Sequence, residues 1–402
     1  MDAKIHVSRL GGTATVPPSK SAAHRAVLCA ALADGTSHIT NIEYSKDIRA
    51  TLGAAAQLGA KITEEPHSLT IKGHGTAGGF VTVTRPVFCN ESGSTLRFLL
   101  PVAGALGVDA MFHLEGRLPS RPLSPLWDEM ERMGCTLTRP TVDTVRCTGR
   151  LRAGEYVIDG GVSSQFITGL LLSAALIPGK SRIRLTGKVE SRPYITMTQR
   201  AMEVFGKETS DFVVTGGTPF HSPGTLTVEG DWSNAAFFLA AKALGSSVEV
   251  TNLSPDSPQG DRAVFDLLPA LENSPVISAA DIPDLVPILA VTAACKNGAV
   301  FTDIRRLRLK ESDRVASVIA MVEALGGKAQ ASEDTLTVYG TGLVGGTVDA
   351  MNDHRIAMSA AIAATACTQP VTILDAQCVE KSYPKFFEEY ARLGGNYEQY
   401  LR

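Results

Sequence analysis

The chain is organised around the residues Arg305-Arg306-Leu307-Arg308-Leu309-Lys310-Glu311-Ser312-Asp313-Arg314-Val315. We predict a strand-like run that leads into a helix, because apolar residues then recur at helical spacing up to the glycine pair Gly326-Gly327. Lys310, Glu311 and Arg314 lie outside this apolar stripe and share the first turn of the helix. Two cations beside a carboxylate suit an acid or base that works next to bound anions. They equally suit a solvated helix start with local ion pairs.

The length and charge of the chain limit its class. A chain of 402 residues exceeds one core of usual size, so we expect two domains. Its content of 44% hydrophobic and 20% charged residues is typical of a soluble enzyme. A net charge of -3 provides no general field for nucleic acid or an anionic membrane, and we expect neither as a partner.

The cysteines indicate the compartment. Seven cysteines without a Cys-x-x-Cys pair favour a reducing environment and argue against a disulfide framework or a zinc site. The first residues contain no basic and apolar leader, so we expect a cytoplasmic protein. The longest apolar run, residues 166–178, is too short to span a bilayer and is predicted to be a buried helix.

Two kinds of helical segment alternate along the chain. Six are rich in alanine and apolar almost all round, as buried helices are: 22–33, 95–106, 166–177, 234–244, 285–295 and 356–367. Six are amphipathic and end at small residues: 47–58, 123–133, 195–205, 262–271, 313–325 and 384–393. Short strand candidates lie between them, for example 61–63 with 69–71, 137–138 with 144–147, and 328–330 with 336–339.

These segments form a repeat of two helices and a small mixed sheet, in units of about 70 residues. Six such units predict an α/β fold of two domains with three units each. The strands expected at 5–10 and 13–16 have no preceding helix, so we assign them to the last unit of the chain. One domain is then 1–17 plus 230–402 and the other is 18–229, and a cleft between them is the expected active site.

Small, polar or charged residues introduce the buried helices, where free backbone N–H groups and the helix dipole favour anions. Cations and hydroxyls dominate these starts, and Asp284 and Glu311 are the outstanding carboxylates. This inventory predicts anionic substrates with one acid and one base. The sequence contains no P-loop, no His/Cys cluster with metal spacing and no Gly-x-Ser-x-Gly motif, so we expect no metal and no cofactor.

Six motifs in order resemble the 5-enolpyruvylshikimate-3-phosphate synthases, and the resemblance covers essentially the whole chain. The motifs are Pro18-Ser19-Lys20-Ser21 with Arg25, Ser92-Gly93-Ser94-Thr95-Leu96-Arg97, Val162-Ser163-Ser164-Gln165-Phe166, Leu309-Lys310-Glu311-Ser312-Asp313-Arg314, Asn352-Asp353-His354-Arg355 and Lys381-Ser382-Tyr383-Pro384. The resemblance implies a two-domain inside-out α/β fold. It also implies transfer of the enolpyruvyl group of phosphoenolpyruvate to the 5-hydroxyl of shikimate 3-phosphate.

The resemblance further implies a role for individual residues. Those implied to bind shikimate 3-phosphate are Lys20, Ser21, Arg25, Ser163, Ser164, Gln165, Ser191, Tyr194, Asp284 and Lys310. Those implied to bind phosphoenolpyruvate are Lys20, Gly93, Arg117 and Gln165 at its phosphate, with Arg314, Arg355 and Lys381 at its carboxylate. By the same similarity Asp284 takes the proton of the 5-hydroxyl and Glu311 protonates the methylene carbon, with Lys20 as a further catalytic residue.

Two alternatives remain open. The enolpyruvyl transferase that acts on UDP-N-acetylglucosamine shares the fold, but its active-site loop carries a cysteine and residues 117–122 here contain none. A noncatalytic anion-binding relative is the other, although a pure anion receptor gains nothing from the carboxylates Asp284 and Glu311. We expect a monomer. Glu91 stands where the family that the chain resembles often has Asn, and Arg306 stands where some members have Asn.

Overall fold

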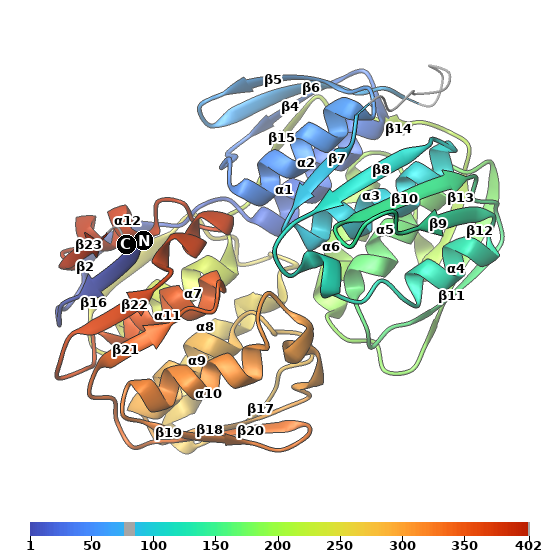
Figure 1. Cartoon of the computed structure of the whole chain (residues 1–402). Helices are drawn as coiled ribbons and strands as arrows, with labels where there is room; N and C mark the ends of the chain where they lie inside the picture. The colour runs from blue at the N-terminus through green and yellow to red at the C-terminus, as the bar shows by residue number, and fades with distance from the viewer. Residues whose placement is uncertain (76–84, 401–402) are drawn as a thin grey trace. The chain divides into compact units, whose positions relative to one another are not determined.

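The structure is a computed structural model that describes residues 1–75 and 85–400. The chain separates into two compact units, one made of Met1–Pro17 and Gly230–Arg402 and the other of Pro18–Glu229 (Figure 1). We call the first the discontinuous unit and the second the continuous unit. Each has its own hydrophobic core.

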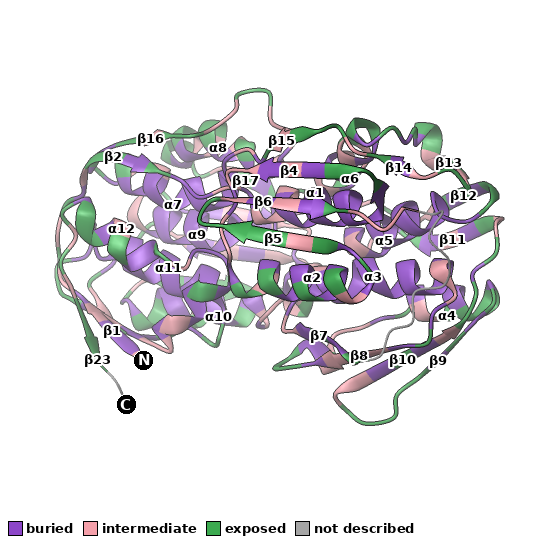
Figure 2. Ribbon diagram, turned by 90° about the horizontal axis from the view of Figure 1, so that it is seen from above, coloured by how far each residue is buried: buried purple, intermediate pink, exposed green. Residues whose placement is uncertain are grey.

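All six helices predicted to be buried are present. They are α1 (Lys20–Leu32), α3 (Gly93–Leu106) and α5 (Ser164–Ala174) in the continuous unit, and α7 (Trp232–Ala243), α9 (Val286–Cys295) and α11 (His354–Ala363) in the discontinuous unit. Their alanines and branched apolar residues leave no polar face, and Figure 2 shows α3 buried along most of its length. Ser19, Ser92 and Ser163 cap α1, α3 and α5 by accepting from backbone N–H groups.

The six predicted amphipathic helices are also present. They are α2 (Lys46–Gln57), α4 (Leu126–Arg132), α6 (Arg192–Val204), α8 (Val264–Ala270), α10 (Arg314–Ala324) and α12 (Phe386–Arg392). Three of them, α4, α8 and α12, are shorter than expected. Prolines explain two of these boundaries, because Pro125 and Pro384 lie just before α4 and α12. The ends of the segment predicted around α8 are 3₁₀ turns, Gly260–Ala263 and Leu271–Asn273.

In the continuous unit three small sheets share one pattern, in which the first strand pair is parallel and the later pairs are antiparallel. Their strand orders are β15 (Thr225–Thr227), β4 (Thr36–Thr40), β6 (Ser68–Lys72), β5 (Lys61–Glu65); β7 (Val87–Asn90), β8 (Ala110–Leu114), β10 (Thr144–Gly149), β9 (Cys135–Thr138); and β11 (Glu155–Asp159), β12 (Gly179–Thr186), β13 (Val213–Gly216). A two-stranded pair joins β3 (Ala33–Asp34) and β14 (Phe220–His221).

The discontinuous unit repeats the pattern. Its sheets are β17 (Val276–Ser278), β18 (Ala299–Thr302), β20 (Thr335–Tyr339), β19 (Lys328–Ala331); β21 (Gly346–Asp349), β22 (Val371–Leu374), β1 (Asp2–Ile5), β23 (Tyr397–Tyr400); and β16 (Ser247–Thr251), β2 (Gly11–Thr15). Helix α10 packs on the first of these sheets (Figure 1). The recurrence of the same mixed sheet with one buried and one amphipathic helix is the repeat that the sequence predicts.

The amino-terminal segment differs in part from the prediction. The first strand is Asp2–Ile5, not residues 5–10, and it lies between β22 and β23, so it completes the last repeat as expected. The second strand, β2, instead pairs with β16 of the fourth repeat.

The strand-like run predicted at 305–309 is also wrong. Arg305–Leu309 is a 3₁₀ helix, and only Leu307 of these five residues is buried. A strand at this place would bury every second side chain on one face of a sheet, which this segment does not do.

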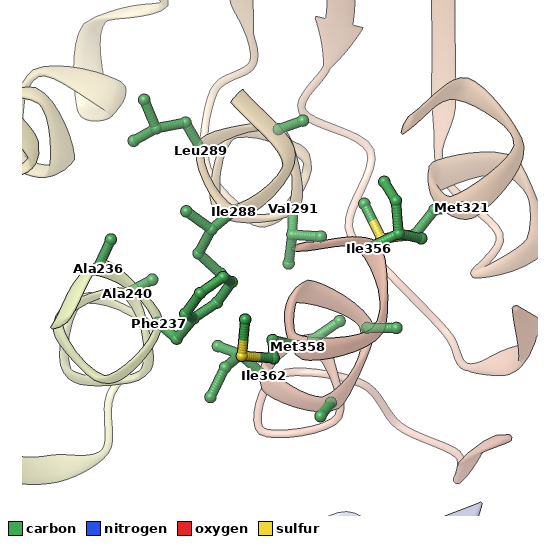
Figure 3. Packing of buried hydrophobic residues seen from close by; sticks show 14 of the residues in the cluster. Ala236, Phe237, Ala240, Ile288, Leu289, Val291, Met321, Ile356, Met358 and Ile362 are labelled. Carbon is green, nitrogen blue, oxygen red and sulfur yellow. The ribbon is translucent and has the colours of Figure 1, made fainter. Parts of the chain in front are cut away.

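The core of the discontinuous unit forms where α7, α9 and α11 meet. Figure 3 shows Phe237 of α7 and Ile288 of α9 pointing toward each other beside Met358 and Ile362 of α11. These side chains are fully buried, so the three helices are held against one another by close packing. None of the helices in residues 1–75 and 85–400 has the length and apolar character needed to cross a membrane.

Candidate active site

Arg314 is the centre of a buried ionic cluster in the discontinuous unit. It is the first residue of α10 and its side chain is only 1% exposed. Its guanidinium donates from Nε to Asp353 Oδ2 at 3.0 Å, from Nη1 to Asp284 Oδ1 at 2.8 Å and from Nη2 to Glu311 Oε2 at 2.8 Å. Three carboxylates thus share one arginine, and the alternative of a solvated helix start is excluded for Arg314.

Asp353 anchors this arginine. It is fully buried, caps α11 by accepting from the backbone N–H of Arg355 at 3.0 Å, and accepts from the hydroxyl of Ser312 at 3.1 Å. Because a cap is fixed by its helix, Asp353 sets the position of the Arg314 guanidinium. The start of α11 therefore orients the side chain at the start of α10.

Asp284 precedes α9 and collects several cations. Its second oxygen, Oδ2, accepts from Arg355 Nη2 at 3.1 Å, and Lys310 Nζ lies 3.9 Å from Oδ1. Burial alone raises the pKa of the Asp284 carboxyl, but the charges of Arg355, Lys310 and Arg314 outweigh it and hold the pKa well below its ordinary value. Asp284 is therefore ionised at neutral pH.

Arg355 differs from Arg314 in having unused donors. Its Nη2 also donates to Ser233 Oγ at 2.8 Å, whereas Nε and Nη1 are buried and have no hydrogen-bond partner among the described residues. Unpaired buried donors of a guanidinium are costly unless a ligand satisfies them. Lys381 is linked to the segment before α11 by a hydrogen bond, because its Nζ donates to the backbone carbonyl of Asn352 at 2.8 Å.

In the continuous unit the start of α1 carries Lys20, whose Nζ lies 2.8 Å from Asp47 Oδ2, with the partly exposed Ser21 next to it. Arg25, one turn further, is buried and bound mainly by the protein. Its acceptors are Thr198 Oγ1, Thr168 Oγ1 and the backbone carbonyls of Ser21 and Tyr194. Burial lowers the pKa of Arg25 to about 10, so it remains a cation at neutral pH.

A second network links the starts of α3 and α5. Gln165 donates from Nε2 to Ser94 Oγ at 3.0 Å and accepts at Oε1 from Arg97 Nη1 at 2.8 Å. Ser163 and Ser164 are buried where α5 begins, and the Ser163 hydroxyl accepts from the backbone N–H of Gln165. The network fixes hydroxyl and amide groups at two helix starts.

Ser191 and Tyr194 lie at the start of α6. Ser191 is buried and precedes the helix with a φ of 55°, in the left-handed region, and Tyr194 is half-buried. The backbone carbonyl of Tyr194 accepts from Arg25, so this helix start is tied to α1. Apart from Arg117, the predicted residues of the continuous unit thus lie in the first two turns, or just before the first turn, of α1, α3, α5 and α6.

The two arginines of the loop after β8 have different surroundings. A Cβ on Gly93 would lie 2.9 Å from Arg121 Nη1 and 3.3 Å from Gln165 Oε1, so only glycine leaves room for these two side chains. The predicted residue Arg117 is exposed and lies in the same loop. Gly116, the residue before Arg117, packs closely against Glu91, because a Cβ on Gly116 would lie 1.6 Å from Glu91 Oε1. The structure therefore places Arg121, which the sequence analysis does not select, against Gly93, and it places Gln165 there as well.

Other residues of these clusters were also missed. Asp353 lies in the motif Asn352-Asp353-His354-Arg355, and its place before an apolar helix is the signal that identifies it as a cap. Arg121 precedes a proline in the loop 117–122, where Arg117 is the only other arginine. Ser233 gives no signal in the sequence, because a serine near the start of a buried helix is ordinary.

The described residues contain no group of three or more His, Cys, Asp or Glu side chains placed to hold a metal ion. All seven cysteines are free. The clusters therefore consist of arginines, lysines, hydroxyls, amides and a few carboxylates, a donor set that suits phosphate and carboxylate groups.

Comparison with known proteins agrees with this chemistry. A family model described as EPSP synthase (3-phosphoshikimate 1-carboxyvinyltransferase) matches residues 5–390. Proteins named 3-phosphoshikimate 1-carboxyvinyltransferase from Clostridium beijerinckii and Clostridioides difficile are 38% and 35% identical to the chain. Each alignment covers 99% of this chain and 98% of the relative.

Solved structures agree as well. An EPSP synthase from Acinetobacter baumannii superimposes with a TM-score of 0.81 at 25% identity and covers 99% of this chain and 100% of that one. The enolpyruvyl transferase NikO from Streptomyces tendae, at 18% identity and a TM-score of 0.78, shares the fold; that match covers 99% of this chain and 98% of NikO. The predicted α/β enolpyruvyl transferase fold is confirmed, and the chain belongs to the EPSP synthase (3-phosphoshikimate 1-carboxyvinyltransferase) family.

Proposed function

We propose that the clusters of the two units are the two halves of one active site, which closes around both substrates in a cleft between the units. The reaction is that of the family: the enolpyruvyl group of phosphoenolpyruvate is transferred to the 5-hydroxyl of shikimate 3-phosphate, and phosphate is released. The observation that carries the proposal is the Arg314 cluster. It brings two carboxylates, Asp284 and Glu311, to one guanidinium beside the unused donors of Arg355.

The continuous unit supplies the phosphate sites in this proposal. Shikimate 3-phosphate takes its 3-phosphate to the hydroxyls at the starts of α5 and α6, with Lys310 from the other unit, and its carboxylate to Arg25. The hydroxyls are those of Ser163, Ser164 and Ser191. Only one N–H of Arg25, on Nη1, has no acceptor among the described residues, so we expect a single hydrogen bond from it to the carboxylate, beside Ser21 and Tyr194.

The phosphate of phosphoenolpyruvate takes the start of α3 in the proposed arrangement. Lys20, Gln165 and the backbone of Gly93 are its predicted partners. The position of Arg121 against Gly93 supports adding this arginine to Arg117 as a phosphate ligand. Free backbone N–H groups at a helix start strengthen such a site.

The carboxylate of phosphoenolpyruvate binds Arg355 first. Arg355 already offers two unpaired buried donors, whereas every donor of Arg314 is engaged by Asp353, Asp284, Glu311 or the carbonyl of Pro283. Arg314 can therefore contact the substrate only by exchanging a carboxylate of the protein for that of the substrate. Lys381 adds a further positive charge.

This exchange has a chemical use. An Arg314 that turns from Glu311 to the substrate removes the contact that favours the charged form of Glu311, so a proton can reside there. Asp284, once Arg355 binds the substrate, regains basicity toward the 5-hydroxyl. In the proposed mechanism Asp284 takes that proton while Glu311 protonates the methylene carbon, which gives a tetrahedral ketal. The ketal then returns a proton from its methyl group to Glu311 as phosphate leaves, so the double bond is restored, and the proton on Asp284 departs with the phosphate.

Lys310 gives a pH dependence. Burial lowers its pKa to about 8, even though the charge of Asp284 acts in the opposite direction. Below this pH the lysine is a cation that attracts the 3-phosphate, and above it the charge is lost. We expect kcat/KM for shikimate 3-phosphate to fall as the pH rises through about 8.

The check is a pH profile of kcat/KM for the wild type and Lys310→Arg. Because arginine stays charged, the alkaline fall that belongs to Lys310 moves to higher pH in the variant. An unchanged alkaline limb in Lys310→Arg would assign that limb to another group.

The reaction itself is tested by phosphate release from phosphoenolpyruvate. Parallel assays contain shikimate 3-phosphate, UDP-N-acetylglucosamine or no acceptor. We expect release only with shikimate 3-phosphate. Release with the sugar nucleotide alone would overturn the acceptor, and no release from folded protein would indicate an anion-binding relative without catalysis.

We also propose a cytoplasmic monomer. Seven free cysteines suit a reducing compartment, and a single chain supplies every residue of the proposed site. Light scattering of the purified protein with and without substrates measures the mass, and cell fractionation gives the location. A stable dimer or a membrane or exported fraction would contradict these two points.

A further inference from the structure

A buried chain of side chains connects α1, α2 and α3 in the continuous unit. His24 Nδ1 lies 2.7 Å from Thr51 Oγ1, which lies 2.7 Å from Thr95 Oγ1, which lies 2.7 Å from Ser92 Oγ. All four residues are buried, with at most 1% of their surface exposed. His24 is on α1, one turn after Lys20, and Ser92 is the cap immediately before Gly93.

The hydrogen bonds of this row of four side chains all run in one direction, from His24 to Ser92. The Thr95 hydroxyl donates to Ser92 Oγ, and a hydroxyl has only one hydrogen. Thr51 must therefore donate to Thr95, and the His24 ring must donate from Nδ1 to Thr51. The imidazole is then the Nδ1–H tautomer, with an unprotonated Nε2.

The surroundings of His24 agree with a neutral ring. Burial lowers the pKa of His24 well below its ordinary value, and the charges of Lys20 and Arg25 act in the same direction. Its Nε2 is buried and has no partner among the described residues, and the ring meets Phe98 edge-on at 6.4 Å between centroids. A protonated ring would need an acceptor at Nε2.

The row of hydrogen-bonded side chains ends at Ser92, at the start of α3. Ser92 Oγ also accepts from the backbone N–H of Thr95 at 3.2 Å, which fixes the first turn of the helix. Gly93 follows, in the place where its backbone lies against Arg121 and Gln165. A shift of this turn would move both the backbone N–H groups and the side chains of the phosphate site.

We propose that His24 is a positioning residue for this phosphate site, acting through Thr51 and Thr95 as an Nδ1–H donor. The inference rests on the proposed function, because it requires that the phosphate of phosphoenolpyruvate binds at the start of α3. His24 does not touch the substrate. It holds the turn to α1, the helix that also supplies Lys20.

The first test compares His24→Leu, which removes the donor, with His24→Asn, whose amide N–H can take the place of Nδ1–H. We expect His24→Leu to raise KM for phosphoenolpyruvate about tenfold, as for the loss of one buried hydrogen bond. KM for shikimate 3-phosphate and kcat should change much less, and His24→Asn should restore most of the affinity. His38→Leu, which removes a histidine paired with Thr70 on a sheet, is the matched control and should leave KM unchanged.

The second test reads the tautomer. Long-range ¹H–¹⁵N spectra of the full-length protein, with the His24 signal assigned by its loss in His24→Asn, should show protonated Nδ1 and bare Nε2 at neutral pH. An Nε2–H tautomer, or equal effects of His24→Leu on both KM values and kcat, would overturn the inference. If His24→Leu does not fold, Thr51→Val against Thr51→Ser tests the same chain.

The outcomes separate the two proposals. A wild-type protein that does not use phosphoenolpyruvate with shikimate 3-phosphate would refute the proposed function. A fully active wild type with an unchanged KM for phosphoenolpyruvate in folded His24→Leu would refute only the positioning role.

Discussion

Glu311→Gln is expected to bind both substrates and to lose about 10² to 10⁴-fold in kcat, the range for removal of a general acid. The amide is nearly isosteric and its oxygen can still accept from Arg314 Nη2, which now lies 2.8 Å from Glu311 Oε2. It carries no proton that it can give to a carbon. Binding and turnover should therefore separate in this variant.

Titration calorimetry with each substrate measures binding, and rapid-quench assays of phosphate release measure the chemical step. Glu323→Gln is the matched control, because Glu323 is exposed on the same helix α10. A Glu311→Gln enzyme with wild-type turnover would remove Glu311 from the mechanism. Loss of substrate binding would instead assign it to the binding site.

Arg314→Met is expected to lower the free energy of unfolding by about 3 to 5 kcal/mol, the cost of breaking a buried ion pair from one side. The substitution leaves Asp353 fully buried without its guanidinium partner. Asp284 and Glu311 are partly exposed and lose less, since water can reach them. The loss therefore comes mainly from Asp353.

Urea unfolding followed by circular dichroism measures this effect. Arg305→Met is the control, because Arg305 forms an exposed pair with Glu333 and should cost under about 1 kcal/mol. Adding Asp353→Asn to Arg314→Met should recover part of the stability, since the unpaired charge is then gone. Equal stability of the Arg314 and Arg305 variants would show that the cluster contributes little to folding.

The sequence predicts the helices of this fold well for a physical reason. Helices such as α5 and α11 are buried on all sides, so their residues must be apolar or small whatever the neighbours are. Short strands carry less information. Asp2–Ile5 is recognised only roughly, because its partners β22 and β23 lie at the other end of the chain.

The site was predictable by residue type but less so by position. Charged groups at helix starts identify Arg314 and Arg355, yet the sequence does not show that Arg314 is saturated by carboxylates while Arg355 keeps open donors. The choice between Arg117 and Arg121 depends on the path of one loop. Tertiary geometry of this kind has no periodic pattern in the sequence.

The position of β1 has a consequence for synthesis of the protein on the ribosome. This strand is made before the other strands of the structure, but it lies between β22 and β23, which come more than 360 residues later. The strands described in the continuous unit, Pro18–Glu229, pair with one another, so this unit can fold while the rest is still being translated, a delay on the order of ten seconds. The amino terminus must remain unpaired throughout that time. Substitutions that make residues 2–5 more hydrophobic should therefore reduce the yield of folded protein after translation more than they change the activity of the folded enzyme.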